Sequence, residues 1–479
     1  MIKAFLSMYR LKFFTTIVYM LQSSEYDEIK YLRWFWSTQD FNKVSRRGFL
    51  KKTRSAKVLL NVLYLLAALI IITGIFCIVK WHSNKFLGGD CFGIALIIGY
   101  PIIIGNLVVL PLMLGRLLFI NPSNNQKILK SEKIFAAFKG EKIAIVGSYG
   151  KTSMKELLMT ILGDNLKVAA TPGNKNVAIS HANFAFKLSG DEDILIIEFG
   201  EGQPKDVELF SRITHPSRAI ITGLAPAHLD RYKTLQAAGD DIFSVANFVD
   251  PSKIYVNSES SETENFIRPK FNKYNKNGVN GWTVDNIKTS IKGTTFDVKK
   301  GKVKLSLSTG LIGEHHIGGL VLATSLALEL GLSEEQVVAG VARTIPYEHR
   351  MQPYELNGAW VIDDTYNGNI EGIRVGCELL SKLDAKRKIY VTPGLVDQGN
   401  DTKVIHEKLG SYIAKSDADT VVLMKNSVTE YIKHGLKVNG YKKKIIVESD
   451  PLKFYMNLSH FIASGDLILM QNDWPDQYK

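Results

Sequence analysis

Two long runs without a charged residue constrain the fold of this chain more than any other feature. The first covers residues 58–79, VLLNVLYLLAALIIITGIFCIV, and the second covers residues 91–115. Each exceeds the roughly 18–20 residues that a helix needs to cross the hydrocarbon core of a bilayer, about 30 Å thick. Pro101 and Pro111 interrupt the second run, which membrane helices tolerate better than soluble ones. We therefore predict two transmembrane helices, about 58–79 and 91–115, over a pair of helices buried in a soluble core.

Positive charge is concentrated in front of the first run. The chain has a net charge of +12, yet residues 1–57 alone hold 12 lysines and arginines against 4 acidic residues. Basic residues that flank a span stay on the cytoplasmic side of the membrane. We expect a cell-membrane protein with both termini in the cytoplasm and only about residues 81–90 on the far side. This local basicity predicts contact with membrane lipid and no nucleic-acid partner.

The aromatic segment YLRWFW, residues 31–36, lies among these basic residues. Such a segment fits an element that lies on an anionic leaflet. It equally fits a segment that packs on the soluble domain. The sequence leaves both interpretations open.

The cysteines exclude two kinds of stabilised fold. Cys77, Cys91 and Cys377 lie far apart, and the chain has no Cys-x-x-Cys motif. A disulfide framework and a cysteine-based zinc site are therefore not expected.

After residue 120 the pattern becomes that of an α/β protein. Short β-branched runs such as 193–199, 218–224 and 388–394 alternate with helical patterns, which favours doubly wound parallel sheets. Residues 272–309 are predicted to form a β-rich excursion. A change in composition near residues 344–352 divides two α/β domains, so we predict boundaries at 1–135, 136–345 and 346–479.

A glycine turn between a predicted strand and a predicted helix gives the strongest chemical signal. Its sequence is GSYGKTS, which is shorter than the general G-x-x-x-x-G-K-[ST] loop. Backbone N–H groups in such a turn surround phosphate, a lysine reaches the β- and γ-phosphates, and a threonine hydroxyl meets Mg²⁺. The predicted ATP-binding residues are Gly147, Ser148, Tyr149, Gly150, Lys151, Thr152 and Ser153.

Later segments follow this loop in a recognisable order. They are TPGNKN at 171–176, IIEFGEGQPKDV at 196–207, AHLDRY at 227–232, HRMQ at 349–352 and IDDTYNGN at 362–369. Together with the shortened loop, they resemble the Mur ligases, ATP-dependent enzymes that join amino acids or peptides to a carboxylate in building peptidoglycan precursors. The resemblance is greatest to the D-alanyl-D-alanine-adding branch and covers about residues 135–479.

The resemblance implies a fold and a set of site residues. The fold would be α/β, with a P-loop central domain of the Mur ligase type and a Rossmann-like C-terminal domain, preceded by two transmembrane helices. The implied catalytic residues are Lys151, Asn174, His228 and Arg350. The C-terminal domain would add nucleotide contacts from Arg350, Asp364 and Asn367. The implied Mg²⁺ ligands are Thr152, Glu198 and His228.

The chain also departs from the family pattern. The family usually has a carbamylated lysine about 14 residues past the histidine, where this chain has Ile242. We predict that Asp240 or Asp241, just before it, supplies the metal-facing carboxylate instead. The C-terminal LMQNDWPDQY, residues 469–478, stands where the family has a basic substrate motif. Residues 1–135 contain no domain for the UDP-sugar.

These observations predict a membrane-anchored, ATP-dependent amide ligase that acts through an acyl phosphate. Its partners would be ATP, a carboxylate-bearing cell-wall precursor, and an amino acid or peptide amine. Two alternatives remain: a membrane-anchored P-loop kinase that regulates polysaccharide export, and a non-catalytic scaffold of wall synthesis. The sequence does not give the substrates or the oligomeric state.

Overall fold

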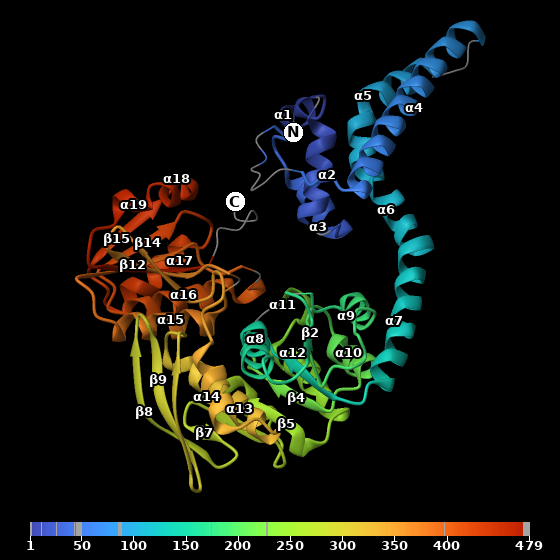
Figure 1. Ribbon diagram of the computed structural model, residues 1–479. Coiled ribbons are helices and arrows are strands. Elements are labelled where there is room, and N and C mark those ends of the chain that lie inside the picture. Colours follow the sequence, from blue (N-terminus) through green and yellow to red (C-terminus); the bar gives the residue numbers. More distant parts are fainter. Residues whose placement is uncertain are drawn as a thin grey trace. The chain divides into compact units, whose positions relative to one another are not determined.

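The computed structural model describes residues 2–472 except residues 11, 25, 43, 45–49, 85–88, 174, 227–228, 367 and 397. The chain divides into two compact units, residues 1–125 and 126–479 (Figure 1). We describe each unit by itself.

The first unit is helical. Its elements are α1 (Ile2–Ser7), α2 (Phe13–Ser23), α3 (Glu28–Ser37), α4 (Arg54–Asn84), α5 (Gly89–Leu107), α6 (Val109–Gly115), the π-helical turn η1 (Arg116–Ile120) and the start of α7 (Asn121–Ala137). Two helical stretches, Ala56–Lys80 and Asp90–Ala137, are long and apolar enough to cross a membrane. In the most apolar part of each stretch, only 17% and 33% of the residues are buried. A core helix of a soluble protein is mostly buried.

Helices α4 and α5 approach closely at two glycines. A Cβ atom on Gly93 would lie 2.4 Å from the carbonyl oxygen of Gly74, and one on Gly74 would lie 2.8 Å from the side chain of Ile97. Small residues at a helix–helix contact allow backbones to pack this tightly. The predicted hairpin is therefore a tightly packed helix pair.

The aromatic segment 31–36 packs within its own unit. The Tyr31 hydroxyl donates a hydrogen bond of 2.8 Å to the carbonyl oxygen of Gly105 on α5, and Phe35 is buried against the same glycine. The Trp36 indole donates to Asn106 over 3.2 Å. Helix α3 thus packs directly against the C-terminal part of α5.

The second unit contains two sheets, and the first of them is the sheet of the central domain. Strand order is β10-β9-β8-β7-β6-β5-β4-β1-β3-β2. Strands β1 to β6 pair in parallel. From β6 to β10 the pairing is antiparallel, and these strands lie in the predicted β-rich excursion. Strands β8 and β9 form a long hairpin (Figure 1).

The strands of the central domain are β1 (Glu141–Val146), β2 (Val168–Ala170), β3 (Ile194–Glu198), β4 (Arg218–Ile221), β5 (Ile254–Asn257), β6 (Asn272–Asn275), β7 (Gly278–Val279), β8 (Trp282–Ser290), β9 (Gly293–Lys300) and β10 (Val303–Thr309). Its helices are α8 (Lys151–Leu162), α9 (Ala178–Ala185), α10 (Asp206–Thr214), α11 (Leu229–Tyr232), α12 (Leu235–Phe243), α13 (Ile317–Glu329) and α14 (Glu334–Ala342). Short 3₁₀ turns are η2 (Ser244–Asn247), η3 (Pro251–Lys253), η4 (Ser261–Phe266) and η5 (Glu314–His316).

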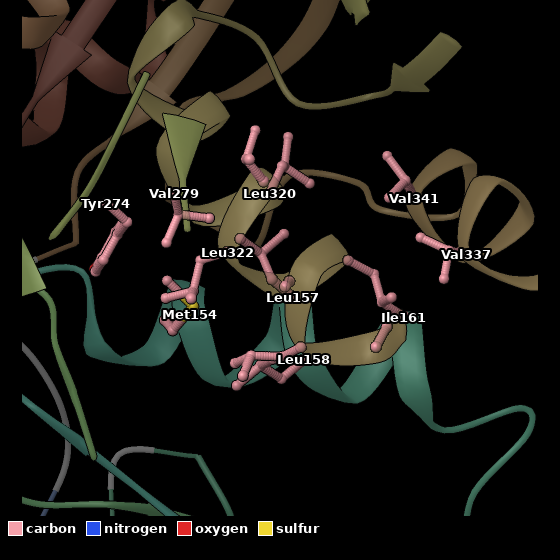
Figure 2. Packing of buried hydrophobic residues seen from close by; sticks show 14 of the residues in the cluster. Met154, Leu157, Leu158, Ile161, Tyr274, Val279, Leu320, Leu322, Val337 and Val341 are labelled. Carbon is pink, nitrogen blue, oxygen red and sulfur yellow. The ribbon is translucent and has the colours of Figure 1, made fainter. Parts of the chain in front are cut away.

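Helix α8 is held in place by a buried apolar stripe. Met154, Leu157, Leu158 and Ile161 recur at helical spacing and face α13 and α14 (Figure 2). Residues three and four apart lie on one face of a helix, so a single stripe can fill this contact. The packing fixes the start of α8, where the predicted phosphate-binding residues lie.

The C-terminal domain is a second α/β domain, and its sheet has the strand order β11-β12-β16-β13-β14-β15. Its strands are β11 (Gln352–Leu356), β12 (Ala359–Asp364), β13 (Arg387–Thr392), β14 (Thr420–Met424), β15 (Lys444–Glu448) and β16 (Asp466–Gln471). Its helices are α15 (Ile370–Lys382), η6 (Gly399–Asp401), α16 (Thr402–Ala414), α17 (Thr429–Val438), α18 (Pro451–Met456) and α19 (Leu458–Phe461). Only β11 pairs antiparallel, which agrees with the Rossmann-like prediction.

Candidate active site

The phosphate loop connects β1 to α8 through two glycines with positive φ. Gly147 has φ +142° and Gly150 has φ +76°, and a Cβ on Gly147 would lie 2.4 Å from Thr222 Oγ1. The Thr222 hydroxyl lies against the carbonyl oxygens of Val146, at 3.1 Å, and of Tyr149. Thr222 follows β4, so the neighbouring strand holds the loop in shape. The predicted strand–turn–helix arrangement is present.

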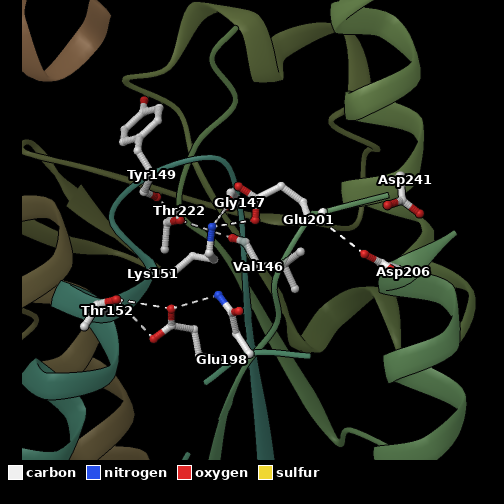
Figure 3. A network of polar contacts seen from close by, with 12 residues as sticks. Val146, Gly147, Tyr149, Lys151, Thr152, Glu198, Glu201, Asp206, Thr222 and Asp241 are labelled. Carbon is white, nitrogen blue, oxygen red and sulfur yellow. Dashed lines mark hydrogen bonds and ion pairs between the residues drawn. The ribbon is translucent and has the colours of Figure 1, made fainter. Parts of the chain in front are cut away.

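Lys151 closes this loop in the structure. Its side chain is buried, with 9% exposure, and its ammonium group donates to the carbonyl oxygen of Gly147 and to Glu201 Oε2, the latter at 2.6 Å. Figure 3 shows Lys151 between these two partners. A lysine in this position turns to phosphate when a nucleotide enters such a loop.

Glu198, at the end of β3, forms the second part of the site. Its carboxylate accepts a hydrogen bond of 3.1 Å from the Thr152 hydroxyl (Figure 3), and its Oε2 lies 3.0 Å from Lys155 Nζ. Glu198 is 2% exposed and Lys155 is fully buried. Ion pairs buried this deeply are expensive to break from one side, so the Glu198 carboxylate is firmly placed beside the loop.

A buried histidine fixes the backbone of Glu198. His181 Nε2 lies 2.9 Å from the carbonyl oxygen of Glu198, and because a carbonyl only accepts, the imidazole is the donor. Burial lowers the pKa of His181 to about 4, so the ring is neutral near pH 7. The backbone N–H of Glu198 donates to Thr171 Oγ1 at 3.0 Å. His181 and Thr171 are thus positioning residues for β3.

The two aspartates predicted to replace the lysine lie on α12, with different surroundings. Asp240 is exposed and accepts from Gln236 at 2.9 Å. Asp241 is buried and accepts from the Tyr232 hydroxyl at 2.7 Å and from the backbone N–H of Lys205 at 2.9 Å. Burial raises the pKa of the Asp241 carboxyl. Their role as metal ligands stays a prediction.

Three other predicted residues, Asn174, His228 and Asn367, lie outside the described residues. Within the described part of the chain, no group of three or more His, Cys, Asp or Glu side chains is arranged to hold a metal ion. The hydroxyl of Thr152 and the carboxylate of Glu198 are nevertheless the hard oxygen donors that Mg²⁺ prefers. The residues present therefore fit the predicted cation in chemical type.

In the C-terminal domain, Arg350 lies in a turn with unusual backbone geometry. Its neighbours His349 and Met351 have φ +60° and +45°, a region that costs energy for residues other than glycine and often marks functional sites. The Arg350 guanidinium stacks on Tyr366, 4.4 Å from the ring centroid. The turn is held by β12, because the backbone N–H of Met351 donates to Asp364 Oδ1 at 3.2 Å.

Asp364 gives a prediction for the pH dependence of stability. Burial raises the pKa of its carboxyl from 3.8 to about 6, so the folded chain binds this proton more tightly than the unfolded chain. The stabilisation is fully present below about pH 4 and is lost as the pH rises through about 6. Relative to Asp364→Asn, the wild type should lose about 1–3 kcal/mol of unfolding free energy between these limits.

Thermal unfolding of the full chain in detergent between pH 4 and pH 7 measures this difference. The substitution also disturbs the bond that Gln471 donates to Asp364 over 2.8 Å, but that offset does not vary with pH. Parallel pH profiles for the two proteins would contradict the prediction.

Two residues of the site were missed from the sequence, Glu201 and Lys155. Lys155 lies one helical turn after Lys151 on α8, and this spacing indicates that the two lysines share one face of the helix. Glu201 follows Glu198 by three residues, beyond the end of a strand, where no periodicity predicts the direction of a side chain.

Comparison with known protein families identifies both α/β domains. Residues 145–327 match the Mur ligase middle domain, and residues 349–471 match the Mur ligase, glutamate ligase domain. The chain belongs to the Mur ligase family through these two domains. The family resemblance read from the sequence is therefore confirmed for this part of the chain.

Individual relatives agree with this assignment. The UDP-N-acetylmuramoyl-tripeptide–D-alanyl-D-alanine ligase of Haemophilus influenzae is 25% identical over 292 residues, 58% of this chain and 62% of that protein. The enzyme of the same name from Borreliella burgdorferi is 28% identical over 288 residues, 58% of this chain and 61% of the relative. The chain thus matches about three fifths of the length of these curated relatives.

Solved structures support the fold. MurF from Acinetobacter baumannii superimposes with a TM-score of 0.65 at 20% identity, covering 73% of this chain and 77% of that one. MurF ligase from Thermotoga maritima, solved in complex with ADP, gives 0.64 at 20% identity, with 74% and 81% covered. The predicted α/β Mur ligase fold with central and C-terminal domains is confirmed.

Proposed function

We propose that this protein is an ATP-dependent amide ligase that extends a peptidoglycan precursor. The observation that supports it best is the phosphate loop with Lys151 and the Thr152–Glu198 pair, placed in the Mur ligase middle domain. The names of its relatives describe ligation of a dipeptide to a UDP-linked muramoyl tripeptide. Two Mur ligase domains also favour a ligase over the export-kinase alternative.

The reaction proceeds in two steps. The substrate carboxylate attacks the γ-phosphorus of ATP, which forms an acyl phosphate and releases ADP. The amine nitrogen of the second substrate then attacks the acyl carbon and gives up a proton, and the C–O bond to phosphate breaks. An amide and inorganic phosphate are the products.

The residues of this chain contribute mainly charge and position. Lys151 would leave Glu201 for the β- and γ-phosphates and stabilise the negative charge that develops on them. Thr152 and Glu198 would hold Mg²⁺, which neutralises phosphate charge and aligns the reacting oxygens. Arg350, fixed by the turn at the start of β11, would clamp phosphate from the C-terminal domain. Closure of the two domains would exclude water from the acyl phosphate.

We further propose that residues 1–125 anchor the ligase in the membrane. The hairpin of α4 and α5 presents apolar side chains such as Leu65, Ile72 and Phe76, which are 61%, 60% and 58% exposed. An anchor would raise the effective concentration of a lipid-linked or membrane-presented precursor. The carboxylate substrate would then be presented at the cytoplasmic surface.

Cysteine labelling tests this topology. In a chain without Cys77, Cys91 and Cys377, a cysteine at Ser83 should react with a membrane-impermeant maleimide in intact cells. A cysteine at Lys437, which is exposed on α17, should react only after lysis. Labelling of position 437 in intact cells would rule out the cytoplasmic placement of the ligase domains.

Purified full-length chain in detergent tests the activity. Given ATP, Mg²⁺ and panels of muramoyl peptide and amine substrates, it should release phosphate and form an amide in equal amounts. Folded protein that binds no nucleotide would favour the scaffold alternative.

A further inference from the structure

The phosphate loop is bordered by two lysine–carboxylate pairs. Lys151 pairs with Glu201 at 2.6 Å and Lys155 pairs with Glu198 at 3.0 Å. Both lysines belong to the first turns of α8, whereas Glu198 is the last residue of β3 and Glu201 lies three residues after it. All four side chains are at most 10% exposed. Each of the two lysines therefore has a carboxylate partner at this end of the sheet.

Nucleotide binding would break one pair and leave the other intact. Lys155 is fully buried against Glu198 and also donates to the carbonyl oxygen of Gly173, so it stays in place. Lys151 lies at the loop itself and is the lysine that phosphate would attract. Its departure would leave Glu201, 7% exposed, without its cation and close to added negative charge. A new cation would stabilise a buried carboxylate in that position.

The other nearby carboxylate is already engaged. Asp241 accepts hydrogen bonds from Tyr232 and Lys205, and Figure 3 shows no contact between it and Lys151, Thr152 or Glu198. Glu201, in contrast, contacts the phosphate-loop lysine directly. Among the described residues, Glu201 is thus the carboxylate best placed to join Glu198 beside the phosphates.

We propose that Glu201 is the second carboxylate of the metal–nucleotide site, in place of the lysine-derived carboxylate that this chain lacks. In the structure it holds Lys151. When Lys151 turns to the phosphates, Glu201 faces the divalent cation beside Glu198. The proposal rests on the proposed nucleotide-binding function and replaces Asp240 or Asp241 in the predicted role.

Calorimetric titration with the non-hydrolysable analogue β,γ-imido-ATP tests it, because the effect of Glu201→Gln should change sign with the metal. In EDTA, the variant should bind the analogue about 5-fold or more tightly than wild type, since Lys151 has no competing carboxylate and one repelling charge is gone. In saturating Mg²⁺ the variant should bind the analogue about 10-fold or more weakly than wild type. The variant should also need a higher Mg²⁺ concentration to reach saturation.

Matched variants complete the design. Glu208→Gln removes an equal charge from the exposed side of α10 and should change neither affinity by more than about 2-fold. Glu201→Asp keeps the charge on a shorter side chain, so it should weaken only the Mg²⁺-dependent binding, by a smaller factor. If Glu201→Gln does not fold, the Mg²⁺-dependent affinity of Glu201→Asp tests the proposal instead.

The outcomes separate this inference from the proposed function. If Glu201→Gln and Glu201→Asp both bind like wild type with and without Mg²⁺, or if Asp241→Asn alone loses the Mg²⁺ effect, the role of Glu201 is wrong. If folded wild-type protein binds no analogue even with Mg²⁺, the nucleotide site itself has been misassigned.

Discussion

Lys151→Ala is expected to reduce ATP turnover by about 10²–10³-fold or more, because we propose that Lys151 contacts the phosphates on which negative charge develops during phosphoryl transfer. In the structure this lysine lies in the phosphate loop and contacts both Gly147 and Glu201. Phosphate release by purified full-length chain, with both substrates present, is the measurement.

The control for this prediction must account for Glu201. Removing Lys151 leaves that carboxylate buried without a partner, which destabilises the fold as well as the reaction. The double variant Lys151→Ala/Glu201→Gln removes both charges, so it should recover stability while turnover stays low. Lys167→Ala, which removes a lysine that is 65% exposed, should leave turnover unchanged. Normal turnover in a folded Lys151 variant would show that the loop does not bind the transferred phosphate.

Glu198→Gln is expected to have the second large effect, on both stability and turnover. The change leaves the fully buried Lys155 without its 3.0 Å partner, a situation that costs about 3–5 kcal/mol. It also removes the charge that would face Mg²⁺ beside Thr152, so turnover should fall by about 10²-fold or more. Thermal unfolding and phosphate release measure the two effects separately.

A second substitution separates the structural role of Glu198 from its role in the reaction. Glu198→Gln/Lys155→Met replaces the buried pair by neutral side chains, so most of the lost stability should return. Turnover should not return, because the double variant still lacks the carboxylate. Recovery of both would mean that Glu198 acts only by holding Lys155.

Local sequence patterns were sufficient to predict the glycine turn between β1 and α8 and several of the parallel strands. The buried run before Gly147 and the helix after Gly150 are short-range features, and the predicted strands at 193–199, 218–224 and 388–394 correspond to β3, β4 and β13. β-Branched residues bounded by glycine and proline signal such strands wherever they lie in the chain.

Contacts between distant segments could not be read in the same way. Lys151 and Glu201 are 50 residues apart, and their pairing depends on β1 and β3 being neighbours in the sheet. Helical spacing places neighbouring residues such as Asp240 and Asp241 on different sides of α12, and only Asp241 is buried. It did not show that Tyr232 and the backbone of Lys205 already occupy the buried one.

The central claim is that ATP activates a carboxylate for attack by an amine. Its most direct test uses UDP-linked muramoyl tripeptide with ¹⁸O in the terminal carboxylate, together with D-alanyl-D-alanine, ATP, Mg²⁺ and the full-length chain in detergent. If an acyl phosphate forms, one ¹⁸O passes from each carboxylate to the released phosphate as the amide forms. Amide formation and the release of labelled phosphate should both require the amine. Phosphate that is released without ¹⁸O, at the same rate with and without the amine, would contradict the account.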